Sequence, residues 1–271
     1  TDARGGRDMA VYTHLTAAEI ADFLDAYDVG DLRSAKGIAE GVSNSNWLIE
    51  TEREHASQRF ILTVFEARTE ADDLPYFLSL LDHLAAKGLP VPRTIHTRDG
   101  ALMREARGKP CALIEFLPGV SVDEPEPAQA RAVGIALADL HLAAADFPQS
   151  RASSLSLPIC VEMLRDNADR FDEIDPQLAT IIPDCGAGVL ERWPTDLPEG
   201  TIHSDLFPDN VLSVGDRVTG LIDFYFACSG ILAYDLAVTH AAWSFGLAEN
   251  AFRPDVGHAL IEGYESRRTL S

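Results

Sequence analysis

The chain has 271 residues, 46% of them hydrophobic, which is enough for two lobes of ordinary size, each with a buried core. Its 22 Lys and Arg against 43 Asp and Glu give a formal net charge of −21, which disfavours nucleic acids and anionic membranes as partners. We expect a cytoplasmic protein with reduced thiols, because the four cysteines form no C-x-x-C pair and no apolar run is long enough to span a membrane.

The N-terminal part predicts a helix followed by a small antiparallel sheet. Residues 1–8 show no pattern and are interpreted as a cloning remnant or a disordered lead. Thr16 and Glu19 form a capping box, and the helix that follows has an apolar face made of Ile20, Phe23, Leu24 and Tyr27. The further elements expected here are two strands and a loop within 36–49, a strand at 59–65, a helix at 73–87, and strands near 102–104 and 111–116.

The second half of the chain is predicted to be mostly helical. The Pro- and acid-rich segment 123–127 marks the connection between the halves. The helices expected after it are 128–144, 159–171, 231–243 and 255–267. A segment at 177–192 is predicted to be poorly formed, because Pro183 interrupts it. His141 falls on the buried side of its helix, which favours a hydrogen-bonded core histidine over a catalyst.

The most informative stretch is TIHSDLFPDNVLSVGDRVTGLIDFYFA, residues 201–227. Its Gly215-Asp216 pair predicts a tight turn between strands at 211–214 and 218–222. In a tight hairpin, the start of the first strand and the end of the second are neighbours. A loop that enters the first strand and a residue that leaves the second therefore share one end of the ribbon.

Three oxygen donors are expected at that end of the hairpin. Asp205 and Asn210 lie in the entering loop, and Asp223 directly follows the second strand. Carboxylate and amide oxygens suit Mg²⁺, which usually binds through one or two carboxylates together with substrate phosphates. Phosphoryl transfer uses one carboxylate to orient and deprotonate a hydroxyl group, and an Asn and a second Asp to hold metal. The stretch therefore predicts a phosphotransferase.

The same stretch carries a family resemblance. The sequence HSDLFPDN followed by IDF resembles the H-x-D-x-x-x-x-N motif and downstream Asp of the aminoglycoside/choline phosphotransferase superfamily. The resemblance implies an α+β, two-lobed protein-kinase-like fold. We expect a small antiparallel-sheet N-lobe at 9–117 and a mostly helical C-lobe at 118–271. Further C-terminal residues are expected to complete the second lobe.

The resemblance implies roles for single residues. Asp205 is the expected catalytic base, and Asn210 and Asp223 are the expected Mg²⁺ ligands. His203 and Asp235 are expected to support the loop by hydrogen bonds, because a buried carboxylate persists only when it is well partnered. ATP is expected to contact a phosphate-covering loop and a hinge, at Gly41, Ser43, Asn44, Ser45, Glu115 and Leu117.

Position 63 departs from the superfamily pattern. Most members carry a Lys near this position that reaches the α- and β-phosphates, and this chain has Thr63 instead. The nearby cations that could substitute are Lys36, Arg59 and Arg68, and the sequence does not choose among them. Two classes of protein therefore stay open, an active small-molecule kinase and a nucleotide-binding pseudokinase. Retention of the base and of both metal ligands favours an active kinase.

The acceptor is predicted from flanking segments, which are GIAEGVSNSN, FILTVFE, DLPYFL and YDLA. These most closely resemble bacterial homoserine kinases of the superfamily. That resemblance implies transfer of the γ-phosphate of ATP to the side-chain hydroxyl of L-homoserine, a step of threonine biosynthesis. Charge alone leaves an aminoglycoside, choline or another hydroxyl acceptor open, since acidic and aromatic residues suit many cations. The residues expected to contact the acceptor are Asp205, Asp209, Tyr225, His240 and Trp243.

Overall fold

The computed structural model describes residues 13–38, 44–66, 70–245 and 251–270. The chain divides into two compact units. Unit 1 comprises Thr1–Glu124 and Pro208–Tyr225, and unit 2 comprises Pro125–Phe207 and Phe226–Ser271. The expected lobes, 9–117 and 118–271, remain a prediction. They differ from these units at 118–124 and at 208–225.

Backbone hydrogen bonds explain why the hairpin after Phe207 belongs to unit 1. Val120 and Ser213 exchange two of them, with N···O distances of 3.1 and 2.9 Å. Leu221 donates its N–H to the carbonyl oxygen of Pro90 at 2.7 Å. The hairpin is therefore attached to the unit that contains the large sheet, although the sequence places it far along the chain.

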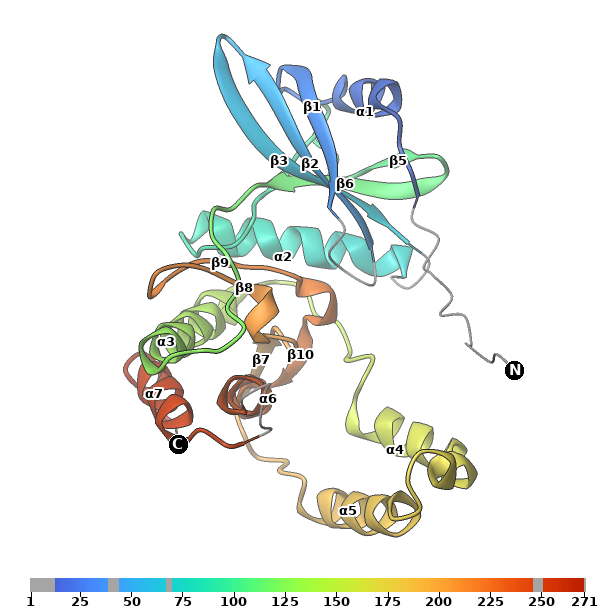
Figure 1. Ribbon diagram of the computed structural model, residues 1–271, viewed down its shortest axis with the longest axis vertical. Coiled ribbons are helices and arrows are strands. Elements are labelled where there is room, and N and C mark those ends of the chain that lie inside the picture. The colour runs from blue at the N-terminus through green and yellow to red at the C-terminus, as the bar shows by residue number, and fades with distance from the viewer. Residues whose placement is uncertain (1–12, 39–43, 67–69, 246–250, 271) are drawn as a thin grey trace, which may run out of the picture. The chain divides into compact units, whose positions relative to one another are not determined.

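Unit 1 is built on an antiparallel sheet with the strand order β1-β2-β3-β6-β4, in which β5 also pairs with β6 (Figure 1). The strands are β1 Asp31–Ile38, β2 Asn44–Arg53, β3 Ala56–Phe65, β4 Thr94–Ile95, β5 Arg104–Ala106 and β6 Lys109–Glu115. The other elements of unit 1 are α1 Ala17–Leu24, η1 Ala71–Asp73, α2 Leu74–Ala86, η4 Pro208–Asn210, β8 Val211–Val214 and β9 Arg217–Leu221. The predicted strands, helices and hairpin of this part of the chain are thus present.

The first helix begins as the sequence predicts. The Thr16 hydroxyl accepts a hydrogen bond from the Glu19 N–H at 3.3 Å, and the Glu19 carboxylate accepts one from the Thr16 N–H at 2.8 Å. This reciprocal pair satisfies two N–H groups that the helix itself cannot bond. The capping box is therefore confirmed.

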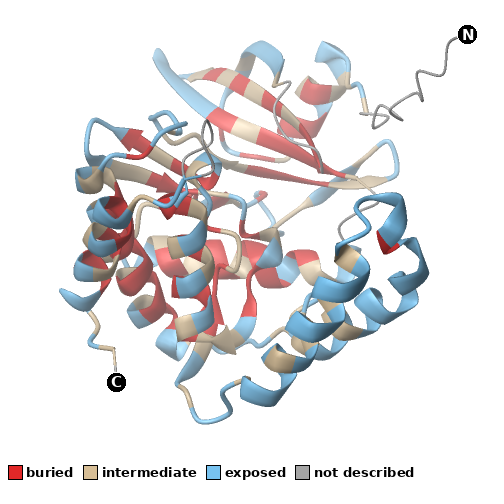
Figure 2. Ribbon diagram, turned by 60° about the horizontal axis from the view of Figure 1, so that its bottom comes forward, coloured by how far each residue is buried: buried red, intermediate tan, exposed pale blue. Residues whose placement is uncertain are grey.

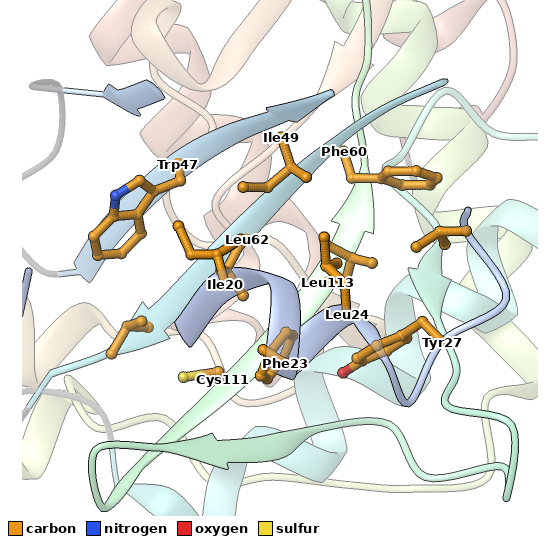
Figure 3. Close-up of a cluster of buried hydrophobic side chains, with 12 residues drawn as sticks. Ile20, Phe23, Leu24, Tyr27, Trp47, Ile49, Phe60, Leu62, Cys111 and Leu113 are labelled. Carbon is orange, nitrogen blue, oxygen red and sulfur yellow. The ribbon is translucent and has the colours of Figure 1, made fainter. Parts of the chain in front are cut away.

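The apolar face of α1 covers one face of the sheet. Figure 3 shows Ile20, Phe23 and Leu24 directed toward strand residues such as Leu62 and Leu113, and all of them belong to one buried cluster. Side chains alternate between the two faces of a strand. Since Leu62 points toward α1, its neighbour Thr63 lies on the opposite face of the sheet.

In its described residues, unit 2 combines five α-helices with a two-stranded antiparallel sheet. Its elements are α3 Pro127–Ala143, η2 Ala144–Asp146, α4 Leu157–Asp166, η3 Ala168–Glu173, α5 Leu178–Arg192, β7 Glu199–Ile202, β10 Cys228–Ile231, α6 Leu232–Ser244 and α7 Pro254–Glu265, and the short turn η5 Phe224–Phe226 crosses the boundary between the units. Buried residues concentrate in α3, α6 and α7, whereas α4 and α5 contain none and are largely exposed in Figure 2. No helix in the described ranges is long and apolar enough to cross a membrane.

Two helices of unit 2 differ from their predicted form. The helix expected at 159–171 ends at Asp166, where Asn167 donates its side-chain amide to the carbonyl of Met163 at 2.8 Å, and η3 follows. The segment expected to be poorly formed is the helix α5, with Pro183 inside it. A proline in the second turn removes a single backbone hydrogen bond, so the helix continues past it.

Helices α3 and α7 approach each other closely at two glycines. A Cβ atom at Gly134 would lie 2.0 Å from the carbonyl oxygen of Leu260, and one at Gly263 would lie 2.1 Å from that of Arg131. Each glycine faces the backbone of the other helix, which cannot move aside as a flexible side chain can. The contact between these helices therefore requires glycine at both positions.

We expect Gly134→Ala to lower the free energy of unfolding by about 1–3 kcal/mol, because the new methyl group forces the helix backbones apart. The control is Gly186→Ala in α5, where a Cβ would meet no described heavy atom within 4 Å. That change should raise stability by up to about 1 kcal/mol through helix propensity. Urea unfolding followed by circular dichroism measures both, and a stabilised Gly134→Ala variant would contradict the close approach.

Candidate active site

The hairpin in unit 1 places Asn210 and Asp223 at the same end, as the sequence predicts. Strands β8 and β9 pair antiparallel, with Val211 opposite Leu221. The Ile222 N–H donates to the carbonyl oxygen of Asn210 at 3.0 Å, one step beyond that pair. The backbones of Asn210 and Asp223 therefore lie at the same end of the hairpin. Both side chains carry oxygen atoms that can bind a metal ion.

Asp223 adopts an unusual backbone conformation and an unusual protonation equilibrium. Its φ of 63° lies in the left-handed region, which a residue with a Cβ adopts only at a cost in energy. Asp223 is exposed by surface area, yet the protein atoms around its carboxyl group displace water and raise its pKa, and the negative charge of Asp209 raises it further, while the Tyr225 N–H lowers it. A cation beside Asp223 would relieve both of the effects that disfavour its ionised form.

In unit 2, a buried carboxylate holds the loop that carries Asp205. Asp235, at the start of α6, accepts hydrogen bonds from the N–H groups of His203 at 2.8 Å and Ser204 at 2.7 Å. It also contacts Nε2 of His141 at 2.9 Å, and the other ring nitrogen of His141 lies 2.8 Å from the Tyr264 hydroxyl. The predicted hydrogen bonds of Asp235 to the loop are therefore present, and His141 is a hydrogen-bonded core histidine, as predicted.

These contacts determine the charge of Asp235. Complete burial alone would raise the pKa of Asp235, but the hydrogen bond from His141 and the charges of His141 and His203 lower it below its usual value. An ionised carboxylate with several donors is stable inside a protein. The loop is thus held by an anion rather than by a neutral acid.

Asp205 lies in a loop whose backbone is fixed on both sides. Its N–H donates to Nδ1 of the fully buried His203 at 3.3 Å, and its carbonyl accepts from the Phe207 N–H at 2.8 Å. The preceding residue, Ser204, has a φ of 68°, again in the left-handed region. The Asp205 side chain is half-buried, so it remains accessible to a small molecule.

Trp243 does not have the exposed ring that an acceptor contact requires. Only 1% of this residue is accessible, and its indole N–H donates to the carbonyl of Leu206 at 2.9 Å. We therefore correct the expectation for Trp243, because a buried ring cannot stack on a substrate cation. It supports the loop next to Asp205 instead. His240 is half-buried and packs near Phe252, with 6.1 Å between ring centroids.

Tyr225 lies in a group of packed aromatic side chains in unit 1. Its ring packs edge-on against Phe65 and Phe77, with centroid distances of 5.4 and 5.7 Å. Burial, followed by the charge of Asp223, raises the pKa of the Tyr225 hydroxyl, which stays protonated. The half-buried Tyr225 thus packs against other aromatic side chains of unit 1, and its expected contact with the acceptor stays a prediction.

The expected nucleotide-binding residues are only partly described. Gly41 and Ser43 lie outside the described residues. Asn44 and Ser45 are buried at the start of β2, where the Asn44 side chain accepts from the Glu66 N–H at 3.3 Å and the Ser45 hydroxyl donates to the Glu66 carboxylate at 2.7 Å. Their side chains are thus engaged within the protein, and only backbone contacts to phosphate stay as a prediction.

The hinge residues are at the end of β6. The N–H of Glu115 donates to the carbonyl of Arg93 at 2.9 Å. Any adenine contact by Glu115 therefore falls to its carbonyl oxygen. The predicted contacts of Glu115 and Leu117 with the base remain predictions.

The candidate cations near position 63 differ in their surroundings. Arg59 forms an ion pair with Glu50 at 3.1 Å, and its guanidinium lies 5.8 Å from the centre of the Phe116 ring. Lys36 is exposed on β1 opposite Leu48, and Arg68 lies outside the described residues. Which of Lys36, Arg59 and Arg68 substitutes for the missing Lys at position 63 therefore stays open.

The sequence analysis missed a fourth cation, Lys109, because it is far from position 63 in the chain. Lys109 pairs with Glu66 at the start of β6. Burial disfavours the ionised form of Glu66, but hydrogen bonds from Lys109, Ser45 and Thr13 outweigh it and lower the pKa of Glu66 to about 2. This cluster includes Ser45, one of the residues expected to contact the phosphates.

Comparison with known proteins agrees with this chemistry. A model of the phosphotransferase enzyme family matches residues 34–270. Curated homoserine kinases from Azorhizobium caulinodans, Rhizobium meliloti and Methylocella silvestris are 45%, 47% and 49% identical to this chain. Each alignment covers 97% of this chain, and 80%, 79% and 80% of the respective relative.

Solved structures show the same fold at low sequence identity. A spectinomycin phosphotransferase in complex with ADP and spectinomycin aligns with a TM-score of 0.72 at 18% identity, covering 93% of this chain and 80% of that one. An amicoumacin kinase in complex with AMP-PNP and Ca²⁺ aligns with a TM-score of 0.72 at 13% identity, covering 95% and 79%. The predicted α+β protein-kinase-like fold is confirmed.

We expect Asp235→Asn to lower the free energy of unfolding by about 3–5 kcal/mol, because it replaces a buried carboxylate that accepts hydrogen bonds from the His203 and Ser204 N–H groups and contacts His141. The control is Asp139→Asn, which removes an exposed partner of Arg267 at 3.5 Å and should cost less than about 1 kcal/mol. Urea unfolding at pH 7 measures both. Equal effects of the two substitutions would contradict the role of Asp235.

The contribution of Asp235 also depends on pH. Because its pKa is lower in the folded state than in the unfolded chain, its stabilisation is present above the unfolded value of about 4. It is lost as the pH falls from there through the folded value. The difference in stability between the wild type and Asp235→Asn should therefore shrink as the pH is lowered below about 4.

Proposed function

Because the chain belongs to the phosphotransferase enzyme family and its curated relatives are homoserine kinases, we propose that it phosphorylates the side-chain hydroxyl of L-homoserine with ATP. The observation that carries this proposal is the identity of 45% to 49% over 97% of the chain. The chain is a kinase that acts on a hydroxyl group. The choice of homoserine, rather than an aminoglycoside or choline, follows from those relatives.

Asp205 is the proposed catalytic base. Its carboxylate takes the proton of the homoserine hydroxyl as that oxygen attacks the γ-phosphorus of ATP, and the bond between the γ-phosphorus and the bridging oxygen of ADP breaks. The products are O-phospho-L-homoserine, ADP and the proton held by Asp205. The fixed backbone around Asp205 supports this role, because general base catalysis depends on precise positioning of the carboxylate.

Asn210 and Asp223 fit the requirements of a Mg²⁺ site. They offer one amide oxygen and one carboxylate, which leaves the remaining positions to phosphates and water, as Mg²⁺ prefers. The raised pKa of the Asp223 carboxyl group marks a site where a cation is favourable. When bound, Mg²⁺ supplies neutralisation of the charge on the transferred phosphoryl group.

Asp209 and His240 are the proposed contacts to the ammonium end of the acceptor. Asp209 is exposed and acidic, and His240 is half-buried. A zwitterionic amino acid needs an acidic or carbonyl partner for its ammonium group and N–H groups or a cation for its carboxylate. ATP is proposed to contact the loop around Gly41 and Ser43 with its phosphates.

We expect Asp205→Asn to lower kcat by roughly 10²–10⁴, the usual share of general base catalysis. The affinity for ADP should change little, because the amide keeps the shape of the side chain. The control is Asp216→Asn in the exposed turn of the hairpin, which should keep wild-type turnover. A coupled assay for ADP release measures kcat. Near wild-type turnover in Asp205→Asn would refute its role as the base.

The acceptor is tested directly with a panel of substrates. The purified chain is given Mg²⁺ and ATP with L-homoserine, L-serine, choline or kanamycin in separate reactions, and ADP release is compared with a reaction that lacks acceptor. We expect L-homoserine to give the highest kcat/KM. A kinase for a different acceptor is indicated if only another compound raises ADP release, and a pseudokinase if none does while ADP still binds.

A further inference from the structure

The proposed acceptor is a zwitterion, whose carboxylate needs a positively charged partner. The strongest partner is a guanidinium, because two of its N–H groups can reach both carboxylate oxygens. Unit 2, which contains Asp205, has no lysine, so its permanently charged cations are arginines. The half-buried arginines in the described part of unit 2 are Arg151, Arg253 and Arg268.

Two of these arginines are engaged at the ends of α7. Arg253 precedes the helix, and its Nη1 donates to the carbonyl oxygen of Pro125 at 2.7 Å. Arg268 follows the helix, with Nη1 at 3.2 Å from the Tyr264 hydroxyl and the guanidinium at 6.0 Å from the centre of the Tyr264 ring. These contacts favour a role for both side chains in fastening α7.

Arg151, by contrast, lies beside strand β10. The Ser229 N–H donates to the backbone carbonyl oxygen of Arg151 at 2.8 Å. The side chain of Arg151 reaches back along the strand, where Nη1 donates to the carbonyl oxygen of Ala227 at 3.3 Å. Residues two apart in a strand direct their backbone groups to the same edge. The main chain and the guanidinium of Arg151 therefore follow one edge of β10.

The loop of Asp205 leaves from the same end of this strand pair. Strands β7 and β10 lie side by side and antiparallel, with Ile202 opposite Cys228 (Figure 1). Ala227 comes directly before this pair of residues, and the loop comes directly after it. The guanidinium of Arg151 is therefore placed at the end of the ribbon from which the chain continues to Asp205.

The dimensions of homoserine fit this arrangement. Neighbouring strands are about 4.8 Å apart, so a group beyond the far edge of β10 lies on the order of 10 Å from the path of β7. Four bonds separate the hydroxyl oxygen of homoserine from its carboxylate carbon, a span of about 5 Å. A hydrogen bond of about 2.8 Å at each end brings the total to roughly 10–11 Å. One homoserine molecule can thus reach from a base in the loop to the guanidinium.

We propose that Arg151 binds the carboxylate of the acceptor and thereby selects an amino acid over a simple amino alcohol. This inference rests on the proposed function, because it needs an acceptor that carries a carboxylate. A guanidinium has five N–H donors, so a hydrogen bond to Ala227 is compatible with a bidentate pair to the carboxylate. The cation also offsets the repulsion that a chain with a net charge of −21 exerts on an anionic group.

The experiment compares two acceptors that differ only in the carboxylate. Propanolamine is homoserine with the carboxylate replaced by hydrogen, and it keeps the amine and the hydroxyl group. Rates of ADP release give kcat and KM for both acceptors with the wild type, Arg151→Met and Arg151→Lys. In Arg151→Met, the KM for L-homoserine should rise by about 10- to 100-fold with kcat little changed. The kcat/KM for propanolamine should stay at the wild-type value.

The conservative variant and a matched control test whether the effect is specific. Arg151→Lys should recover part of the affinity for homoserine, because it keeps the charge without the planar fork. Arg253→Met removes another half-buried arginine of unit 2 that bonds a carbonyl oxygen, and it should keep the wild-type KM for homoserine. The Tm and the Kd for ADP of each variant show whether the fold and the nucleotide site are intact.

The outcomes separate failure of this role from failure of the proposed function. An unchanged KM for homoserine in Arg151→Met, or an equal loss of kcat/KM with both acceptors, would overturn the carboxylate role and leave the proposed function in place. If Arg151→Met does not fold, Arg151→Lys decides, and an unchanged preference for homoserine over propanolamine overturns the role. A wild type that releases no ADP with L-homoserine would refute the proposed acceptor, and the role of Arg151 with it.

Discussion

The buried charge of Asp235 is the constraint on which the arrangement of unit 2 depends. An ionised carboxylate loses several kcal/mol of hydration when it is buried, so the fold must supply donors from several elements. The loop gives the N–H groups of His203 and Ser204, and α3 gives His141. Consecutive N–H groups converge on one anion when one residue is left-handed, which accounts for the φ of Ser204.

The pKa of Asp223 in unit 1 shifts in the opposite direction. The pKa of Asp235 is lowered because its partners outweigh burial, whereas the pKa of Asp223 is raised because burial and the Asp209 charge outweigh a single N–H donor. A carboxylate that is surrounded by hydrogen-bond donors, as Asp235 is, supports the fold. One that lies among unfavourable charges is suited to a ligand that brings positive charge. The opposite pKa shifts thus favour a supporting role for Asp235 and are consistent with the proposed metal-binding role of Asp223.

The sequence predicted those features whose signals are local. The capping box at Thr16 and the tight turn at Gly215 each rest on a few adjacent residues, and both are present. The role of Trp243 could not be read in this way. An exposed aromatic residue and a buried one look alike in a sequence, and its partner Leu206 is adjacent only in the folded chain. The prediction of a poorly formed segment at 177–192 was wrong because the loss of one backbone hydrogen bond at Pro183 does not end the helix.

A neutral residue at position 63 changes what the proposed metal site requires of Asp223. Thr63 and Asn46 contribute dipoles but no charge, in a chain whose net charge is −21. In the proposed site, a bound divalent cation would offset the repulsion among Asp223, Asp209 and the phosphates, and its attraction falls with distance. Small displacements of the Asp223 carboxylate consequently matter. The edge-on packing of Tyr225 against Phe65 and Phe77 restricts such displacements two residues after Asp223, because closely packed side chains have little room to move.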